Sequence, residues 1–266
     1  MKTSTVTLDM LILLRSVNAT TRDFEVSTTN MTFARLILAA SINEPMPSSK
    51  SNQLPSRPAA MALVQYYLDN VFSLLPAFQE TALFNALDAV YHTHGRPAQD
   101  FENWLLFMVL GIGAMGQSRS SSDAYYKEGV TWVARALKYA DKVLTTGHVA
   151  QIQALILLVE YSMLDPAHFD SWQLIGFACR AVVDLGFHQD PPKGQQPDKK
   201  TLDLRRRIFY CVYCLDRSVL IVQFCQDILL TITDQSAWFM LDHFLSLTIR
   251  QASHSHLCRL SNHRPV

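Results

Sequence analysis

Two amphipathic patterns, joined by a short polar loop, decide the fold class of this chain. They read SWQLIGFACRAVVDLGFHQDPP (residues 171–192) and TLDLRRRIFYCVYCLDR (residues 201–217). Apolar residues recur three and four positions apart in both, which places them on one face of an α-helix. These faces comprise Ile175, Ala178, Cys179, Val182, Leu185 and Gly186 in the first pattern, and Leu204, Ile208, Cys211, Val212, Leu215 and Val219 in the second. Pro191 and Pro192 cannot continue a helix, so we expect two nearly antiparallel helices.

The same helical period extends over most of the chain upstream of this pair. It predicts helices over residues 8–17, 33–40, 58–75, 78–91, 101–115, 125–144 and 149–163. Strand-like alternation is rare, and the chain contains 9 glycines, which also favours helices. We therefore predict an all-α fold, either a multi-helix bundle or a stacked helical array, with a flexible N-terminal segment.

The composition divides the chain into three parts. Residues 1–57 are rich in Ser, Thr and Asn, and prolines punctuate their end, so we predict a flexible, linker-like segment. Residues 58–222 carry the helical pattern and form the predicted domain. Residues 223–266 close with a stretch rich in His and Arg, from His254 to His263, and form an atypical C-terminal tail.

The charge balance argues against direct contact with nucleic acid. Lys plus Arg and Asp plus Glu both number 23, whereas a protein that neutralises many phosphates needs a local excess of basic charge. The apolar run Trp104–Met115 is shorter than the roughly 20 residues that span a bilayer, so we predict no membrane contact. The chain contains 5 cysteines, and most of them lie on apolar helix faces. The odd number and these positions indicate reduced thiols.

Three motifs are typical of nucleotide-binding, redox or metal-binding sites, but their surroundings favour structural roles. Residues 111–116 (GIGAMG) match the GxGxxG string of dinucleotide-binding folds, yet a helix enters them instead of a strand, so we interpret the glycines as sites of close helix packing. Cys211 and Cys214 lack the second ligand pair of a zinc site, and their mid-helix position favours buried thiols. His92 and His94 lack a nearby carboxylate or thiol. We therefore predict no catalytic, cofactor-binding or metal-binding residues and no enzyme activity.

Charged residues on the second helix of the pair are the candidate contact residues. Three consecutive arginines lie near its start, where positive charge opposes the helix dipole, so a carboxylate should offset them. Asp184, Asp190 and Asp203 are candidate partners. We favour an ionic network that fixes the helix pair over the alternative, a contact with a partner or effector. The candidate structural or partner-contact residues are Arg205, Arg206, Arg207, Asp216 and Arg217.

Four stretches, in the same order, resemble the middle homology region of fungal zinc-cluster transcription factors. They are LVQYYLDNVFSLLPAFQE (63–80), FENWLLFMVLGIGAMG (101–116), WQLIGFACRAVVDLGFHQDP (172–191) and LRRRIFYCVYCLDR (204–217). The resemblance covers residues 60–217. It implies an all-helical regulatory domain of a nuclear, DNA-dependent transcription regulator that is modulated by a small-molecule effector, a co-regulator or a second copy of the chain.

The chain also departs from this family in two respects. The six-cysteine zinc cluster that binds DNA in the family is absent, so the resemblance places zinc and DNA contact in a separate upstream module. Residues 221–227 replace the Gly-Arg-Pro turn that follows the LDR tripeptide in the family. We expect that residues 223–266 reflect a truncated or mis-spliced reading frame.

Two other functions are compatible with the sequence. An all-helical enzyme or ligand carrier would use a pocket lined by Trp104, Trp132, Tyr161 and Trp172. A protein-interaction scaffold would expose a large apolar patch. A deep pocket with converging ionisable groups would favour the first, and a filled core with ionic pairs at helix ends would favour the regulatory domain.

Overall fold

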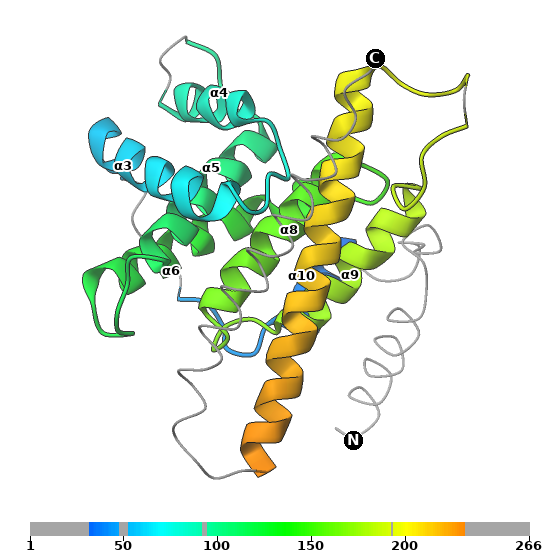
Figure 1. Ribbon diagram of the computed structural model, residues 1–266. Helices are drawn as coiled ribbons and strands as arrows, with labels where there is room; N and C mark the ends of the chain where they lie inside the picture. The colour runs from blue at the N-terminus through cyan, green and yellow to red at the C-terminus, as the bar shows by residue number, and fades with distance from the viewer. Residues whose placement is uncertain (1–31, 48–52, 92–94, 193, 232–266) are drawn as a thin grey trace, which may run out of the picture.

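The described part of the chain is built from helices (Figure 1). Its one β-bridge joins Ile42 to Phe169. The computed structural model describes residues 32–47, 53–91, 95–192 and 194–231, with side chains up to residue 223. The all-α prediction is confirmed. The elements are α2 (Phe33–Ser41), α3 (Arg57–Tyr67), η1 (Leu68–Phe72), α4 (Glu80–Val90), α5 (Asp100–Met115), α6 (Ala124–Ala136), η2 (Leu137–Tyr139), α7 (Ala140–Val143), α8 (Val149–Leu164), α9 (Ser171–Asp184) and α10 (Lys199–Thr231).

Two helices, α5 and α8, form the centre of the body. Every residue from Trp104 to Met115 in α5 is buried, and so is every residue from Gln151 to Ser162 in α8. A helix that is apolar on all sides must be surrounded by other helices. Accordingly, α5 packs against α3, α4, α6 and α8, while α8 packs against α5, α9 and α10. The long helix α10 lies along α8 and α9 at one side of the body (Figure 1).

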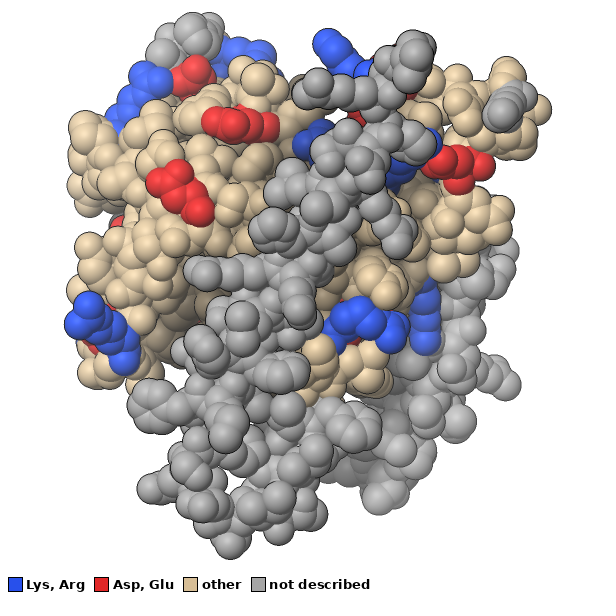
Figure 2. Space-filling model, viewed as in Figure 1, with Lys and Arg blue, Asp and Glu red and all other residues tan. Residues whose placement is uncertain are grey.

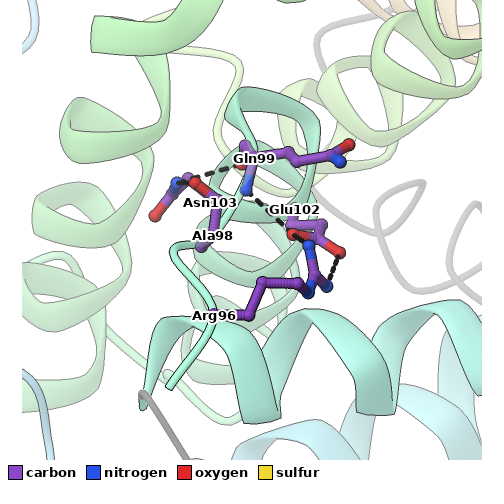
Figure 3. Close-up of polar contacts among 5 residues, drawn as sticks. All are labelled: Arg96, Ala98, Gln99, Glu102 and Asn103. Carbon is purple, nitrogen blue, oxygen red and sulfur yellow. Dashed lines mark hydrogen bonds and ion pairs between the residues drawn. The ribbon is translucent and has the colours of Figure 1, made fainter. Parts of the chain in front are cut away.

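Side-chain caps set where the helices begin. The Asp123 carboxylate accepts a hydrogen bond from the Tyr126 amide at the start of α6, and Asp170 does the same for α9. At the start of α5, the Gln99 amide donates to Glu102 Oε2 at 2.8 Å, and Arg96 holds both oxygens of that carboxylate (Figure 3). Such caps satisfy amides that the first helical turn leaves without partners.

The glycines of the GIGAMG stretch bring helices close together, as the sequence predicts. A Cβ atom on Gly113 would lie 2.6 Å from the carbonyl oxygen of Leu63 in α3. A Cβ atom on Gly111 would lie 2.6 Å from Val133 Cγ2 and 3.3 Å from the Gly129 carbonyl oxygen in α6. Side chains cannot occupy these positions, so the backbones of α3 and α6 pack directly on α5.

Two predicted elements differ from the structure. The single helix expected over residues 125–144 is divided into α6, η2 and α7, because a tighter turn at Leu137–Tyr139 interrupts it. This turn holds the Tyr139 ring 6.2 Å from the ring of Phe107. The helix expected over residues 58–75 changes to π-helical hydrogen bonding at Leu68. A period of three and four residues does not resolve such local changes in winding.

The helical body begins upstream of the boundary that we predicted at residue 58. Helix α2 lies within the predicted linker, and Phe33, Leu36 and Ile37 on it belong to the hydrophobic core. Its end is held by the α8–α9 loop, where the Asp170 amide donates to the Ser41 carbonyl oxygen at 2.7 Å. The predicted helix at 8–17 and most of the predicted tail at 223–266 lie outside the described residues.

Candidate functional site: the α9–α10 helix pair and the buried Glu160 cluster

The end of α9 is a Schellman motif that Arg205 of α10 covers. The Phe187 amide donates to the Val182 carbonyl oxygen, and Gly186 takes a left-handed φ of +68°, which glycine adopts without strain. Arg205 donates to the Gly186 carbonyl oxygen at 2.8 Å, and its guanidinium carbon lies 4.3 Å above the Phe187 ring. Arg205 therefore joins the two helices through a backbone carbonyl and an aromatic ring, and its charge also lowers the pKa of Asp190.

Arg206 pairs with one of the predicted acidic partners. Its guanidinium donates to both oxygens of Asp190, at 3.1 and 2.6 Å. The hydrogen bonds from Arg206 hold the pKa of Asp190 below its ordinary value. Both side chains are about half exposed, so water screens the pair and its effect on stability is small. Helix α10 begins at Lys199, so the three arginines lie beyond the first turn and the helix dipole opposes them less than we expected.

The remaining candidate residues differ in their contacts. Asp216 and Arg217 form an ion pair, and the Arg217 guanidinium lies 5.6 Å from the centre of the Tyr213 ring. Arg207 is half-buried and forms no hydrogen bond or ion pair with another described side chain. The structure therefore places these residues on α10 without bringing them together into one site.

Burial suppresses the reactivity of the thiols on these helices. It raises the pKa of Cys179 to about 11, and the nearby Asp216 carboxylate adds to the shift. Burial also raises the pKa of Cys211 well above its ordinary value, with a further contribution from Glu160, and raises that of Cys214. Because the thiolate is the nucleophile and the metal ligand, these residues behave as core side chains.

Glu160 is a buried carboxyl group that the sequence analysis did not single out. It is 5% exposed on α8, and the Tyr67 hydroxyl of α3 donates to its Oε2 at 3.0 Å. Its Oε1 has no hydrogen-bond partner among the described residues. Burial raises the pKa of Glu160 to about 8, although the Tyr67 hydrogen bond lowers it. The apolar context of this residue in ILLVEYSML was the available signal, since an acid there must be buried.

A second buried acid, Asp165, stabilises the loop between α8 and α9. Its carboxylate accepts hydrogen bonds from the Tyr161 hydroxyl at 2.7 Å and the Tyr126 hydroxyl at 3.2 Å, and His168 Nδ1 lies 2.7 Å away. Burial and the nearby carboxylate raise the pKa of Tyr161 above its ordinary value. The cluster connects α6, α8 and the loop, so its geometry is that of a structural anchor.

The aromatic residues proposed for a ligand pocket have separate roles. Trp132 stacks on Phe107 at 6.0 Å, and Tyr161 packs edge-on against Phe169 at 5.9 Å. Trp104 is fully buried in α5, whereas Trp172 is 46% exposed on α9. Trp172 is therefore exposed on α9, whereas Trp104, Trp132 and Tyr161 are packed in the core.

Charged groups of both signs are distributed over the described surface (Figure 2). On the face shown in Figure 2, Lys and Arg alternate with Asp and Glu in small groups, so the described part of this face has no extended basic patch. The described residues contain no group of three or more His, Cys, Asp or Glu side chains that could hold a metal ion. None of the helices in the described ranges is long and apolar enough to cross a membrane.

The helices from α3 to α10 coincide with a known domain. Residues 64–223 match the family model described as the fungal specific transcription factor domain. The chain belongs to this family. The match covers more than half of the chain and confirms the resemblance that residues 60–217 indicated. The domain is therefore the regulatory, helical domain of a fungal transcription factor.

Similar proteins from two fungi are named as regulators. Pyrimidine pathway regulatory protein 1 of Saccharomyces cerevisiae is 33% identical over 114 residues, which cover 42% of this chain and 12% of the relative. Positive regulator of purine utilization of Emericella nidulans is 23% identical over 230 residues, which cover 65% of this chain and 22% of the relative. The chain thus spans less than a quarter of each relative. No solved structure gives a significant match.

Proposed function

We propose that this protein acts in the nucleus as a non-catalytic modulator of transcription by RNA polymerase II. The observation that carries the proposal is that the family match at residues 64–223 lies within one packed helical body, which runs from α2 to α10. DNA contact is assigned to a zinc cluster in a separate module, since the chain has no six-cysteine cluster and its acidic and basic residues both number 23. In this proposal, zinc belongs to that separate module.

A tethering experiment tests this proposal. The chain would be fused to an unrelated DNA-binding domain and a weak activation domain, and reporter transcription would be measured in fungal cells. We expect the intact chain to raise or lower transcription relative to Leu106→Asp, which places a charge in the core of α5 and unfolds the domain. Equal transcription from the two fusions at matched protein levels would contradict the proposal.

Exposed apolar side chains on α9 and α10 favour protein contact as a second role. Trp172 and Val183 on α9 are exposed, as are Tyr210 and Tyr213 on α10. Aromatic side chains that face solvent are typical of interaction surfaces. A co-regulator, a second copy of the chain and a small-molecule effector remain the predicted partners. Substituting Tyr210 and Tyr213 by Ser should change the tethered transcription at matched levels of folded protein, and an unchanged reporter would argue against this surface.

A further inference from the structure

The carboxyl group of Glu160 lies where α8, α3 and α10 meet. From α3, the Tyr67 hydroxyl donates to one of its oxygens at 3.0 Å, and the other oxygen has no partner among the described residues. From α10, the buried Cys211 is close enough for the charge of Glu160 to raise its pKa. Arg207 and Cys214, one turn to either side of Cys211, also affect the pKa of that thiol. Within the described residues, only burial and the Tyr67 hydrogen bond affect the pKa of Glu160.

No cation from the other neighbouring helices compensates the Glu160 carboxylate in the described part of the chain. The segment Trp104–Met115 of α5 contains no titratable side chain. On α9, Cys179 is directed toward Asp216 of α10. The titratable side chains of α9, α7 and η1 are Cys179, Arg180, Asp184, Asp141, Lys142 and Asp69, and none of them contributes to the pKa of Glu160. An ionised carboxylate in these surroundings would lack both water and a counter-ion.

We propose that loss of the proton from Glu160 loosens the packing of α10 on α8, so that the α9–α10 pair responds to pH. Hydration of the carboxylate requires one neighbouring helix to move. Helices α3 and α10 each have a face open to solvent, whereas the facing segments of α5 and α8 are buried on all sides. Helix α3 is fixed on α5, because the Leu63 backbone packs directly on Gly113 and the Tyr66 hydroxyl donates to the Gly116 carbonyl oxygen at 2.7 Å. Helix α10 is therefore the one that we expect to move, and its Tyr213 is 52% exposed. This inference stands on the Glu160 geometry and does not depend on the proposed function.

The direction of the pH effect follows from the two states of the carboxyl group. In the closed arrangement, in which α10 packs on α8, burial raises the pKa of Glu160 from 4.5 to about 8. In the open arrangement, water reaches the carboxyl group and its pKa has the ordinary value. The closed arrangement therefore binds the proton more tightly. Its stability is greatest below about pH 4.5, falls as the pH rises toward 8 and levels off above that value. The opening equilibrium should increase by about tenfold per pH unit within this window.

Amide hydrogen exchange on the full chain tests the inference. Exchange would be followed by mass spectrometry at pH 6, 7 and 8 in the wild type and in Glu160→Gln, which keeps the shape of the protonated acid. Comparing the two proteins at each pH removes the intrinsic pH dependence of exchange. We expect the rate ratio of wild type to variant for peptides covering residues 207–215 to rise by about tenfold from pH 6 to 7 and by about fivefold from pH 7 to 8, where the effect begins to level off. A ratio that stays constant with pH would overturn the proposal.

Two controls separate local loosening from other effects. Peptides covering residues 105–110 of α5 should keep the same exchange ratio at every pH, and an equal loss of protection there would show global unfolding and overturn the proposal. If Glu160→Gln does not fold, Tyr67→Phe provides a second test. The Tyr67 hydrogen bond lowers the pKa of Glu160 in the closed arrangement, so its removal should raise the pH at which the loss of protection in α10 levels off, while the pH at which the loss begins stays the same. A levelling-off at lower or unchanged pH would contradict the assignment to Glu160.

Discussion

The central helices α5 and α8 and the peripheral pair α9–α10 are held in place by different interactions. In α5 and α8, the central segments are buried on every side, and glycines allow neighbouring backbones to touch. In α9 and α10, one face is buried and the other carries exposed side chains such as Val183 and Tyr213. Their relative position also depends on polar contacts from Arg205 and Arg206. Close packing of buried side chains and backbones therefore fixes the position of α5 and α8. The position of α9 and α10 depends on one buried face and on the polar contacts of two arginines.

The largest expected difference between the two regions is in side-chain truncation. Leu106 of α5 is fully buried, so Leu106→Ala should lower the free energy of unfolding by about 2–5 kcal/mol through lost apolar contact and a cavity. Val183 of α9 is 57% exposed, so Val183→Ala should change it by less than about 0.5 kcal/mol. Urea unfolding of the full chain, followed by circular dichroism, measures both. Similar losses for the two variants would show that α9 is enclosed as tightly as α5.

Matched glycine substitutions sharpen the comparison at the level of the backbone. A methyl group on Gly113 would meet the carbonyl oxygen of Leu63 at 2.6 Å, and a backbone atom cannot yield as a side chain can. Gly113→Ala should therefore destabilise the domain by about 1–3 kcal/mol. Gly176 of α9 has open space around it, so Gly176→Ala should stabilise by up to about 1 kcal/mol because alanine favours the helix. Thermal unfolding measures both variants, and a gain in stability for Gly113→Ala would contradict close packing of α3 on α5.

The sequence predicts the parts of this fold that depend on helical period and fails where a contact joins distant segments. The period predicts the positions of α5, α8 and α9 closely, and the apolar setting of the GIGAMG glycines predicts their packing role. Helix α2 is buried because it packs against α7 and α9, and the Asp170 amide of the α8–α9 loop donates to the Ser41 carbonyl oxygen at its end. No local pattern encodes these contacts between distant segments. The composition of residues 1–57 therefore indicates a linker although residues 33–41 are part of the core.

The same distinction applies to the candidate site. The sequence offers Asp190 as one of three candidate acidic partners for the arginine cluster, and in the structure Arg206 pairs with it. It does not indicate that Arg205 bonds to a backbone carbonyl, since charge pairing alone favours an aspartate. It also misses Glu160, whose neighbours Tyr67 and Cys211 lie on two other helices. Each of these neighbours is more than 40 positions from Glu160 in the sequence.

The smallest expected effects concern the arginines that join α9 to α10. Arg205 is half-buried, stacks on Phe187 and donates to the Gly186 carbonyl oxygen, so Arg205→Ala should lower the free energy of unfolding by about 1–2 kcal/mol. Arg206 forms an exposed ion pair with Asp190, so Arg206→Ala should lower it by less than about 1 kcal/mol, and added salt should reduce this loss further.

The effect of salt on stability distinguishes the Arg205 contact from the Arg206–Asp190 ion pair more clearly than the loss of unfolding free energy does. Stacking on an aromatic ring and a half-buried hydrogen bond are screened less than an exposed ion pair, so the loss in Arg205→Ala should persist in 1 M NaCl. Arg205→Lys keeps the charge but loses the planar guanidinium that stacks on Phe187, and it should retain only part of the stability. Full stability in Arg205→Lys would indicate that charge alone holds α9 to α10. The helix pair would then depend on the same screened electrostatics at both arginines, and the geometry of the Schellman motif would contribute little to its position.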